Sequence, residues 1–120
     1  MRYGPAVKMP ASDVIVGKMA LLSDTECASA CEDFANRFQS GKRGPLVAER
    51  SFGSTGQPFL MRWPQWGMQF RISTKREYLP DGSQFEGVGV PVDIPVPRRL
   101  SDLTEEGNTH LERALKMLLK

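Results

Sequence analysis

The chain has 120 residues, of which 40% are hydrophobic and 25% charged, and its formal net charge is +2. This length fits one domain or part of one, with the composition of an ordinary globular protein. The small net charge favours neither a nucleic acid nor an anionic membrane as a partner. No apolar run approaches the roughly 20 residues that cross a bilayer, so we expect no membrane span.

The first half of the chain has the pattern of a strand, a helix and a second strand. Residues 1–13 show little periodicity and predict an irregular lead-in, and the apolar run 14–23 has the length of a strand. Apolar residues recur at helical spacing over 29–40, with Gly41 as the expected C-terminal cap. Residues 45–49 predict another short strand. Tight links in such a unit favour a parallel sheet.

The side chains of the predicted helix divide into an apolar and a polar face. Phe34 and Phe38 lie four residues apart and are expected to face the core, whereas Glu32 falls on the polar face and is expected to face solvent. The only cysteines, Cys27 and Cys31, would share a helical face, but the geometry within one helix suits a disulfide poorly. Two thiols without a nearby histidine do not make a zinc site. We therefore predict small, buried, apolar cysteine side chains and no metal site.

The second half predicts a hairpin, an extended segment and a final helix. Residues 50–58 form a glycine-punctuated loop, and the alternating runs 59–63 and 68–74 predict strands joined by the turn "PQWG". The proline-rich segment 87–99 is extended but cannot be a central strand throughout. The final helix starts at Thr109. Its predicted apolar stripe consists of four leucines, Leu111, Leu115, Leu118 and Leu119.

Two local features of these elements allow more specific expectations. Thr109 and Glu112 have the spacing of a capping box at the start of the final helix. Trp63 and Trp66 flank the proline turn of the hairpin and are expected to cap a core or an interface. If they are exposed, they indicate contact with another subunit or another segment.

A serine stands among small residues at the start of the helix over 29–40, in the stretch "CASAC". Backbone N–H groups at a helix N-terminus lack partners within the helix, and such groups can hold the oxyanion of a tetrahedral intermediate. Small neighbours would let a carbonyl group approach the hydroxyl of Ser29 closely. In a second interpretation Ser29 only caps the helix and the alanines allow tight packing. Spacing alone favours this second, structural interpretation.

Four segments in the same order resemble the C-terminal processing (tail-specific) serine peptidases. The stretch "CASACEDF" is similar to the "SAAEDF" or "SASE" signature of that family, and "PLVAERSFGSTGQP" is similar to its "VGExTxG" segment. The stretch "YLPDGSQFEGVGVPVDIPV" is similar to its "PDGxxxEGxGVxPDIxV" segment, and "LERALKMLL" to its closing helix. The resemblance runs from about residue 17 to the end. Each motif alone is weak, but four in order are fairly specific.

The resemblance implies an α/β fold of the ClpP/crotonase-like β-β-α kind, with a mixed sheet and two main helices. Residues 1–120 are then expected to be the C-terminal portion of one peptidase catalytic domain, without its upstream strands or a PDZ-like module. A polypeptide substrate and no cofactor are implied, together with export of the parent protein, which is common among relatives. A truncated sheet leaves open edges, through which a homodimer could form.

The resemblance also assigns roles to single residues. Ser29 matches the nucleophile, and the N–H of Ala30 matches a donor that helps to hold the oxyanion. Ser54 stands where many members have a lysine as general base, and a hydroxyl cannot act as a free-amine base. A second branch, similar to the tricorn protease core and closer to this chain, uses an upstream histidine and a glutamate that Glu86 matches. The upstream histidine is absent, and we do not assign His110, at the start of the last helix, as the base.

Three functions stay open at this point. The first is a serine endopeptidase that forms an acyl-enzyme on Ser29, with these 120 residues inactive alone for want of a base. The second is a non-catalytic peptide-binding or scaffold relative, which the serine at position 54 favours. In that case Glu86 is a solvent-facing charge at a strand end. The third is a ClpP-like or crotonase-like relative with other chemistry, because a similar fold does not carry function across.

Overall fold

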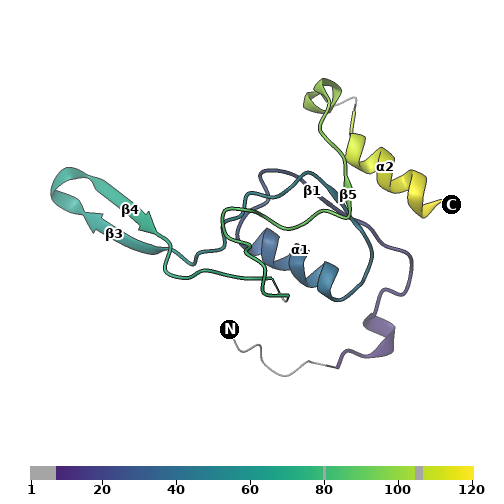
Figure 1. Cartoon of the computed structure of the whole chain (residues 1–120), viewed down its shortest axis with the longest axis horizontal. Helices are drawn as coiled ribbons and strands as arrows, with labels where there is room; N and C mark the ends of the chain where they lie inside the picture. The colour runs from purple at the N-terminus through teal and green to yellow at the C-terminus, as the bar shows by residue number, and fades with distance from the viewer. Residues whose placement is uncertain (1–7, 80, 105–106) are drawn as a thin grey trace.

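The computed structural model describes residues 8–79, 81–104 and 107–120, so the first seven residues of the predicted lead-in lie outside the described residues (Figure 1). Two helices and five strands form the framework: α1 (Ala30–Ser40), α2 (Thr109–Leu118), β1 (Leu21–Ser23), β2 (Leu46–Ala48), β3 (Phe59–Trp63), β4 (Met68–Ile72) and β5 (Ile94–Pro95). The described residues also form three single-turn 3₁₀ helices: Ala11–Asp13 before β1, Pro64–Trp66 between β3 and β4, and Leu100–Leu103 between β5 and α2. None of the described helices has the length and apolar character that a bilayer crossing requires.

A three-stranded parallel sheet in the order β1-β2-β5 forms the centre of the molecule. Val47 of β2 lies opposite Leu22 on one side and Ile94 on the other. The predicted strand–helix–strand unit and its parallel pairing are therefore confirmed. The first strand is shorter than the predicted run 14–23, because only its last three residues lie opposite β2.

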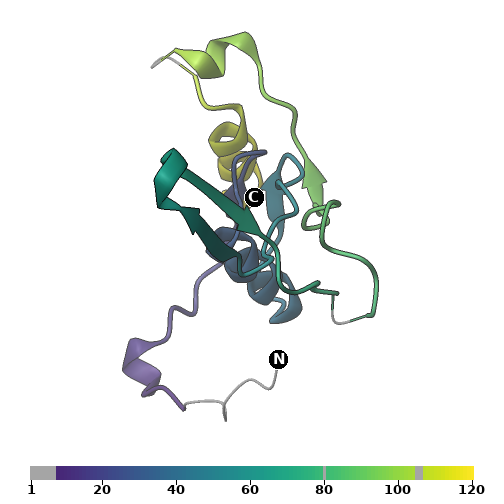
Figure 2. The ribbon, with the colours of Figure 1, turned by 90° about the vertical axis from the view of Figure 1, so that its left-hand side faces the viewer.

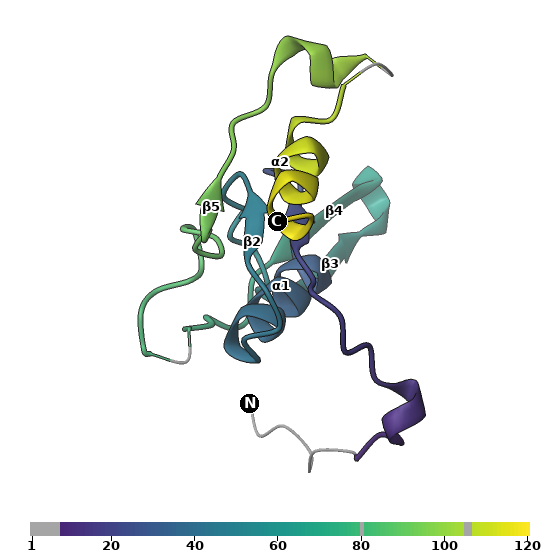
Figure 3. The same cartoon turned by 90° about the vertical axis from the view of Figure 1, so that its right-hand side faces the viewer.

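The two helices cover opposite faces of this sheet, with β1 and β5 between them (Figures 1 and 3). Successive side chains of a strand point to opposite faces. Leu46 and Ala48 pack with Ala35 of α1 in one apolar cluster, and Val47 packs with Ala114 of α2 in another. The core is thus two apolar layers, one on each side of β2.

The packing face of α1 differs from the predicted face. The helix buries Glu32, Ala35 and Phe38, whereas Phe34 is 60% exposed. Glu32 is 0% exposed, so its predicted solvent-facing position is wrong. Periodicity could not identify this, because the carboxylate is buried against hydrogen-bond donors from a distant loop rather than against apolar side chains.

The start and the packing face of α2 also correct the sequence interpretation. The N-terminal cap is Asn108, whose Oδ1 accepts the N–H of Leu111 at 2.9 Å, whereas Thr109 is the first helical residue. The helix buries Ala114 against the sheet, and much of the predicted leucine stripe is exposed, with Leu119 at 83%. The small Ala114 side chain allows α2 to approach Val47 of β2 closely.

The strands β3 and β4 form the predicted antiparallel hairpin, and this hairpin projects from the body of the molecule (Figures 1 and 2). Its register places Met61 opposite Phe70 and Trp63 opposite Met68. The ring of Trp63 contacts those of Trp66 and Phe70 edge to face, with centroids 6.2 and 5.0 Å apart. Trp66 is 67% exposed, so in this structure the two tryptophans cover no core.

Candidate active site

The turn into α1 places Ser29 in an unusual backbone conformation. Ser29 is the N-terminal cap residue of α1, with φ 57° and ψ −122°. A positive φ is uncommon for a residue with a Cβ and costs energy that the surrounding structure must offset. The residue is exposed, as is Ala30, the first residue of the helix. A sharp, strained turn into a helix that presents a serine outward also occurs at nucleophile elbows.

Three segments that are far apart in the sequence meet at this turn: 27–32, 51–55 and 85–90. The N–H of Ser29 donates to the carbonyl oxygen of Ser54 at 2.8 Å, and the N–H of Phe52 donates to the carbonyl oxygen of Cys27 at 3.0 Å. The loop 51–55 is also bound from its other side, where the carbonyl oxygen of Gly53 accepts the N–H of Gly87 at 2.8 Å. Main-chain hydrogen bonds therefore hold the candidate nucleophile between the loop and its own helix.

Glu32 is the side chain at the centre of the junction, the place where the segments 27–32, 51–55 and 85–90 meet. Its Oε1 accepts the hydroxyl of Ser51 and the N–H of Gly53, each at 2.6 Å. Its Oε2 accepts the N–H of Ser54 at 2.8 Å and that of Ser29 at 3.2 Å. Sequence reasoning did not assign Glu32 a part in the site. The spacing of Ser29 and Glu32 is that of a capping box, and this signal could have predicted the carboxylate at the Ser29 N–H.

Glu86 lies on the other side of the same loop. Its Oε1 accepts both the N–H of Thr55 at 2.9 Å and the Thr55 hydroxyl at 2.7 Å. Thr55 is the residue after Ser54, whose carbonyl holds the Ser29 N–H. Contacts through the loop therefore link the predicted positions Ser29, Ser54 and Glu86. The side chain of Glu86 is half-buried rather than fully solvated.

The hydrogen-bond network around Thr55 extends to three charged side chains, Glu77, Lys75 and Asp33. Oε2 of Glu77 lies 3.1 Å from the Thr55 hydroxyl, which shares its single proton between Glu86 and Glu77, and Glu77 forms an ion pair with Lys75. The hydrogen bond from Lys75 is the main cause that lowers the pKa of Glu77. Burial, followed by the negative charge of Glu77, raises the pKa of Asp33. Two neighbouring carboxyl groups are thus shifted in opposite directions.

A disulfide joins Cys27 and Cys31, so the prediction of unpaired cysteines is wrong. The prediction assumed that both residues lie on one helix. The helix begins only at Ala30, and Cys27 lies in the segment before the positive-φ turn. The turn brings the two Cα atoms to 5.4 Å, a separation that suits a disulfide. The five-residue segment closed by this bond has Ser29 at its middle.

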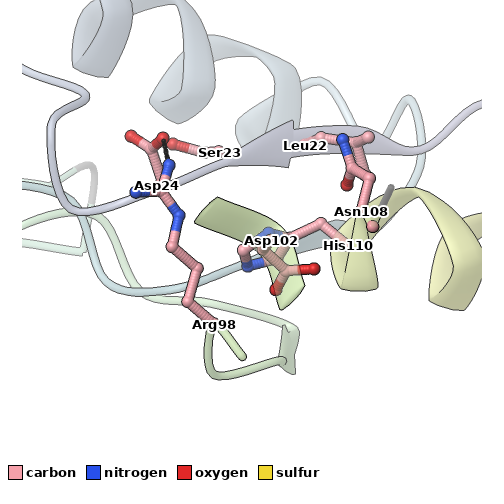
Figure 4. Close-up of a pocket in the computed structure, with 8 residues that line it drawn as sticks. Leu22, Ser23, Asp24, Arg98, Asp102, Asn108 and His110 are labelled. Carbon is pink, nitrogen blue, oxygen red and sulfur yellow. Dashed lines mark hydrogen bonds and ion pairs between the residues drawn. The ribbon is translucent and has the colours of Figure 1, made fainter. Parts of the chain in front are cut away.

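The single histidine lies in a separate polar pocket of about 190 Å³ at the end of β1 (Figure 4). Arg98 pairs there with Asp24 at 2.7 Å, and His110 and Asp102 line the same pocket. Nε2 of His110 is buried and has no hydrogen-bond partner among the described residues. None of the predicted site residues lines this pocket. Within the described ranges, no group of three or more histidine, cysteine, aspartate or glutamate side chains could hold a metal ion.

Comparison with known proteins agrees with the resemblance seen in the sequence. Residues 6–96 match the profile of peptidase family S41. The crystal structure of a candidate peptidase from Parabacteroides merdae ATCC 43184 is similar, with a TM-score of 0.71 and 25% identity over 84% of this chain. Mature CPAF complexed with lactacystin is also similar, with a TM-score of 0.68 and 21% identity over 82% of this chain. No curated protein matches the sequence.

A third similar structure is the photosystem II D1 C-terminal processing protease, with a TM-score of 0.54 and 24% identity over 84% of this chain. The matched regions are 31%, 19% and 24% of the three chains, in the order given. The chain therefore spans less than a third of each of these structures. CPAF and the D1 C-terminal processing protease, at 21% and 24% identity, show a similarity of fold alone.

Proposed function

Because the chain belongs to peptidase family S41, we propose that it carries the nucleophile of a serine endopeptidase of the C-terminal processing type, and that this nucleophile is Ser29. The observation that carries the proposal is the exposed, positive-φ position of Ser29 at the first turn of α1. A helix capped for stability alone does not require this strain, since an ordinary cap residue has extended backbone angles.

The reaction proposed for Ser29 is acyl transfer. Its Oγ attacks the carbonyl carbon of a peptide bond, and the C–N bond breaks as the amine leaves with a proton. Water then cleaves the ester and regenerates the hydroxyl. The N–H of Ala30 lies in the first turn of α1, where helical N–H groups have no partner within the helix, and is proposed to bind the oxyanion.

The general base is proposed to come from outside the described residues. Ser54, which stands where many relatives have a lysine, contributes main-chain contacts to the site, and its hydroxyl is too weak a base for this role. Glu86, which matches the glutamate of the branch that this chain resembles and accepts two hydrogen bonds from Thr55 beside Ser54, is proposed to help orient that base. The chain by itself is then expected to hydrolyse peptides very slowly, because a serine hydroxyl is a weak nucleophile without an adjacent base.

A non-catalytic peptide-binding relative is the second candidate, and the serine at position 54 favours it. A fluorophosphonate probe, applied to the protein as the cell makes it, separates the two functions. An enzyme is labelled at Ser29, and the label disappears in Ser29→Ala. A probe that labels neither protein, or both equally, rejects Ser29 as a nucleophile.

The partners proposed are a polypeptide substrate and a second copy of the chain. Among the described strands β3 and β4 pair only with each other, so both outer edges of the hairpin are open. Open edges can pair with another chain. The side chains that alternate onto one face of this hairpin are all apolar: Phe59, Met61, Trp63, Met68, Phe70 and Ile72.

A further inference from the structure

We infer that Glu32 is the positioning residue that imposes the strained backbone of Ser29 and so turns its hydroxyl outward. The inference rests on the proposed function, because it assigns Glu32 a part in presenting the nucleophile. It starts from the four hydrogen bonds that the Glu32 carboxylate accepts, from Ser29, Ser51, Gly53 and Ser54.

Glu32 is buried, so its carboxylate depends on hydrogen bonds from the protein in place of those from water. The residue is 0% exposed, and a buried carboxylate is costly unless donors replace its lost water. The four donors are three main-chain N–H groups and one hydroxyl, all neutral. Hydrogen bonds to an ionised acceptor are stronger than those between neutral groups. Glu32 therefore holds main-chain groups in place rather than balancing a nearby cation through these contacts.

One atom of Glu32 joins the nucleophile to the neighbouring loop. Oε2 accepts the N–H of both Ser29 and Ser54, while the carbonyl of Ser54 accepts the same Ser29 N–H. The Ser29 N–H thus points inward to two acceptors. With φ at 57°, this inward N–H is compatible with an exposed Ser29 side chain. The energy that favours these bonds offsets the cost of the positive φ.

A purely structural cap would account for only part of this arrangement. A capping box needs the Ser29 N–H alone as donor to the glutamate. Glu32 also holds Gly53 and Ser54, which lie in the loop that follows β2, and so it fixes the nucleophile turn relative to the rest of the junction. We therefore expect a change at Glu32 to alter the Ser29 backbone in protein that is still folded.

The decisive variant is Glu32→Gln, which keeps the side-chain size. Its amide replaces one acceptor oxygen by an NH₂ donor, which then faces either Ser29 and Ser54 or Ser51 and Gly53. The one-bond Cα–Hα coupling of Ser29, measured by NMR, reports the sign of its φ. Glu112→Gln on the exposed side of α2 is the matched control. If Glu32→Gln does not fold, Glu32→Asp keeps the charge and withdraws the carboxylate by one methylene.

The expected result is a Ser29 coupling that changes to the negative-φ range in Glu32→Gln and stays unchanged in Glu112→Gln. Fluorophosphonate labelling of Ser29 should slow by at least roughly tenfold at a temperature where both variants are folded, as expected for a misplaced catalytic group. An unchanged coupling overturns the inference, whether or not the protein labels. If the wild-type protein as the cell makes it fails to label, the proposed function fails separately, and the coupling still decides whether Glu32 sets the Ser29 backbone.

Discussion

The N–H of Ser29 and the carbonyl oxygen of Ser54 are 2.8 Å apart, and this hydrogen bond fixes the candidate nucleophile to a loop that lies 25 positions further along the chain. The loop is held in turn by the segment 85–90, through the carbonyl of Gly53 and the hydroxyl of Ser51. The position of Ser29 therefore depends on how closely these two segments approach each other.

Gly53→Ala should loosen this approach. Gly53 has φ +81°, and an added Cβ would lie 2.7 Å from the nitrogen of Gly89 and 2.8 Å from that of Val88. We expect a loss of about 3 kcal/mol in unfolding free energy, from the disfavoured φ and the clash together. Gly82→Ala is the matched control, because φ is +84° there and, among the described residues other than its chain neighbours, no atom lies within 4 Å of the added Cβ. Denaturant unfolding of both variants measures the difference, and equal losses would contradict the close approach.

The disulfide between Cys27 and Cys31 should contribute measurable stability. Closing a loop of five residues removes conformational freedom from the unfolded chain, and the loop-entropy relation gives about 2 kcal/mol. The double variant Cys27→Ser/Cys31→Ser is expected to lose about this amount in thermal or denaturant unfolding. Wild-type protein treated with a dithiol reductant should lose the same amount. A reductant that leaves the wild-type transition unchanged would show that the bond does not form in solution.

The pH dependence of stability should report the ion pair of Glu77 and Lys75. The hydrogen bond from Lys75 lowers the pKa of Glu77 from its ordinary value of 4.5. A carboxyl group with a lowered folded-state pKa stabilises the fold above its unfolded pKa, and this contribution is lost as the pH falls through the folded value. Glu77→Gln should therefore be less stable than wild type at pH 7, and unfolding curves should show this difference shrinking as the pH falls below 4.5 and through the lowered folded-state pKa of Glu77.

Asp33 should behave in the opposite way. Burial, with the charge of Glu77, raises its pKa from the ordinary value of 3.8. Its contribution to stability is therefore present below the unfolded pKa and is lost as the pH rises through the folded value. We expect Asp33→Asn to be more stable than wild type at pH 7, with the difference disappearing in acid. Unfolding curves recorded between pH 3 and pH 7 test this, and a less stable variant at pH 7 would reject the repulsion between Asp33 and Glu77.

Local patterns in the sequence were sufficient to predict the framework of this fold. The strand–helix–strand unit and the hairpin over 59–72 follow from apolar periodicity and from the "PQWG" turn, which are properties of neighbouring residues. The helix start at Ser29 was equally clear, because small and cap-forming residues precede an amphipathic pattern. Each of these signals is local and needs no knowledge of which segments meet in space.

The details of the candidate site depend on contacts between distant segments, which periodicity does not encode. Glu32 looks like a solvent-facing residue until the donors of Ser51, Gly53 and Ser54 are placed around it. Cys27 pairs with Cys31 only because the chain turns sharply before the helix. Helical periodicity thus failed for two different reasons: Glu32 is buried by donors from a distant loop, and Cys27 lies before the helix that was predicted to contain both cysteines.

The hairpin allows a test of self-association. Phe70 lies on its apolar face, opposite Met61, while the neighbouring Gln69 points to the other face. Two copies that pair through a hairpin edge would join their apolar faces into one continuous surface, and a charge at position 70 would replace apolar contacts between side chains of neighbouring strands. Phe70→Lys should therefore shift sedimentation-velocity profiles toward the monomer, whereas Gln69→Lys should leave them close to wild type. If wild-type protein sediments as a monomer at all concentrations, or both variants change alike, the proposed homodimer through this edge is wrong.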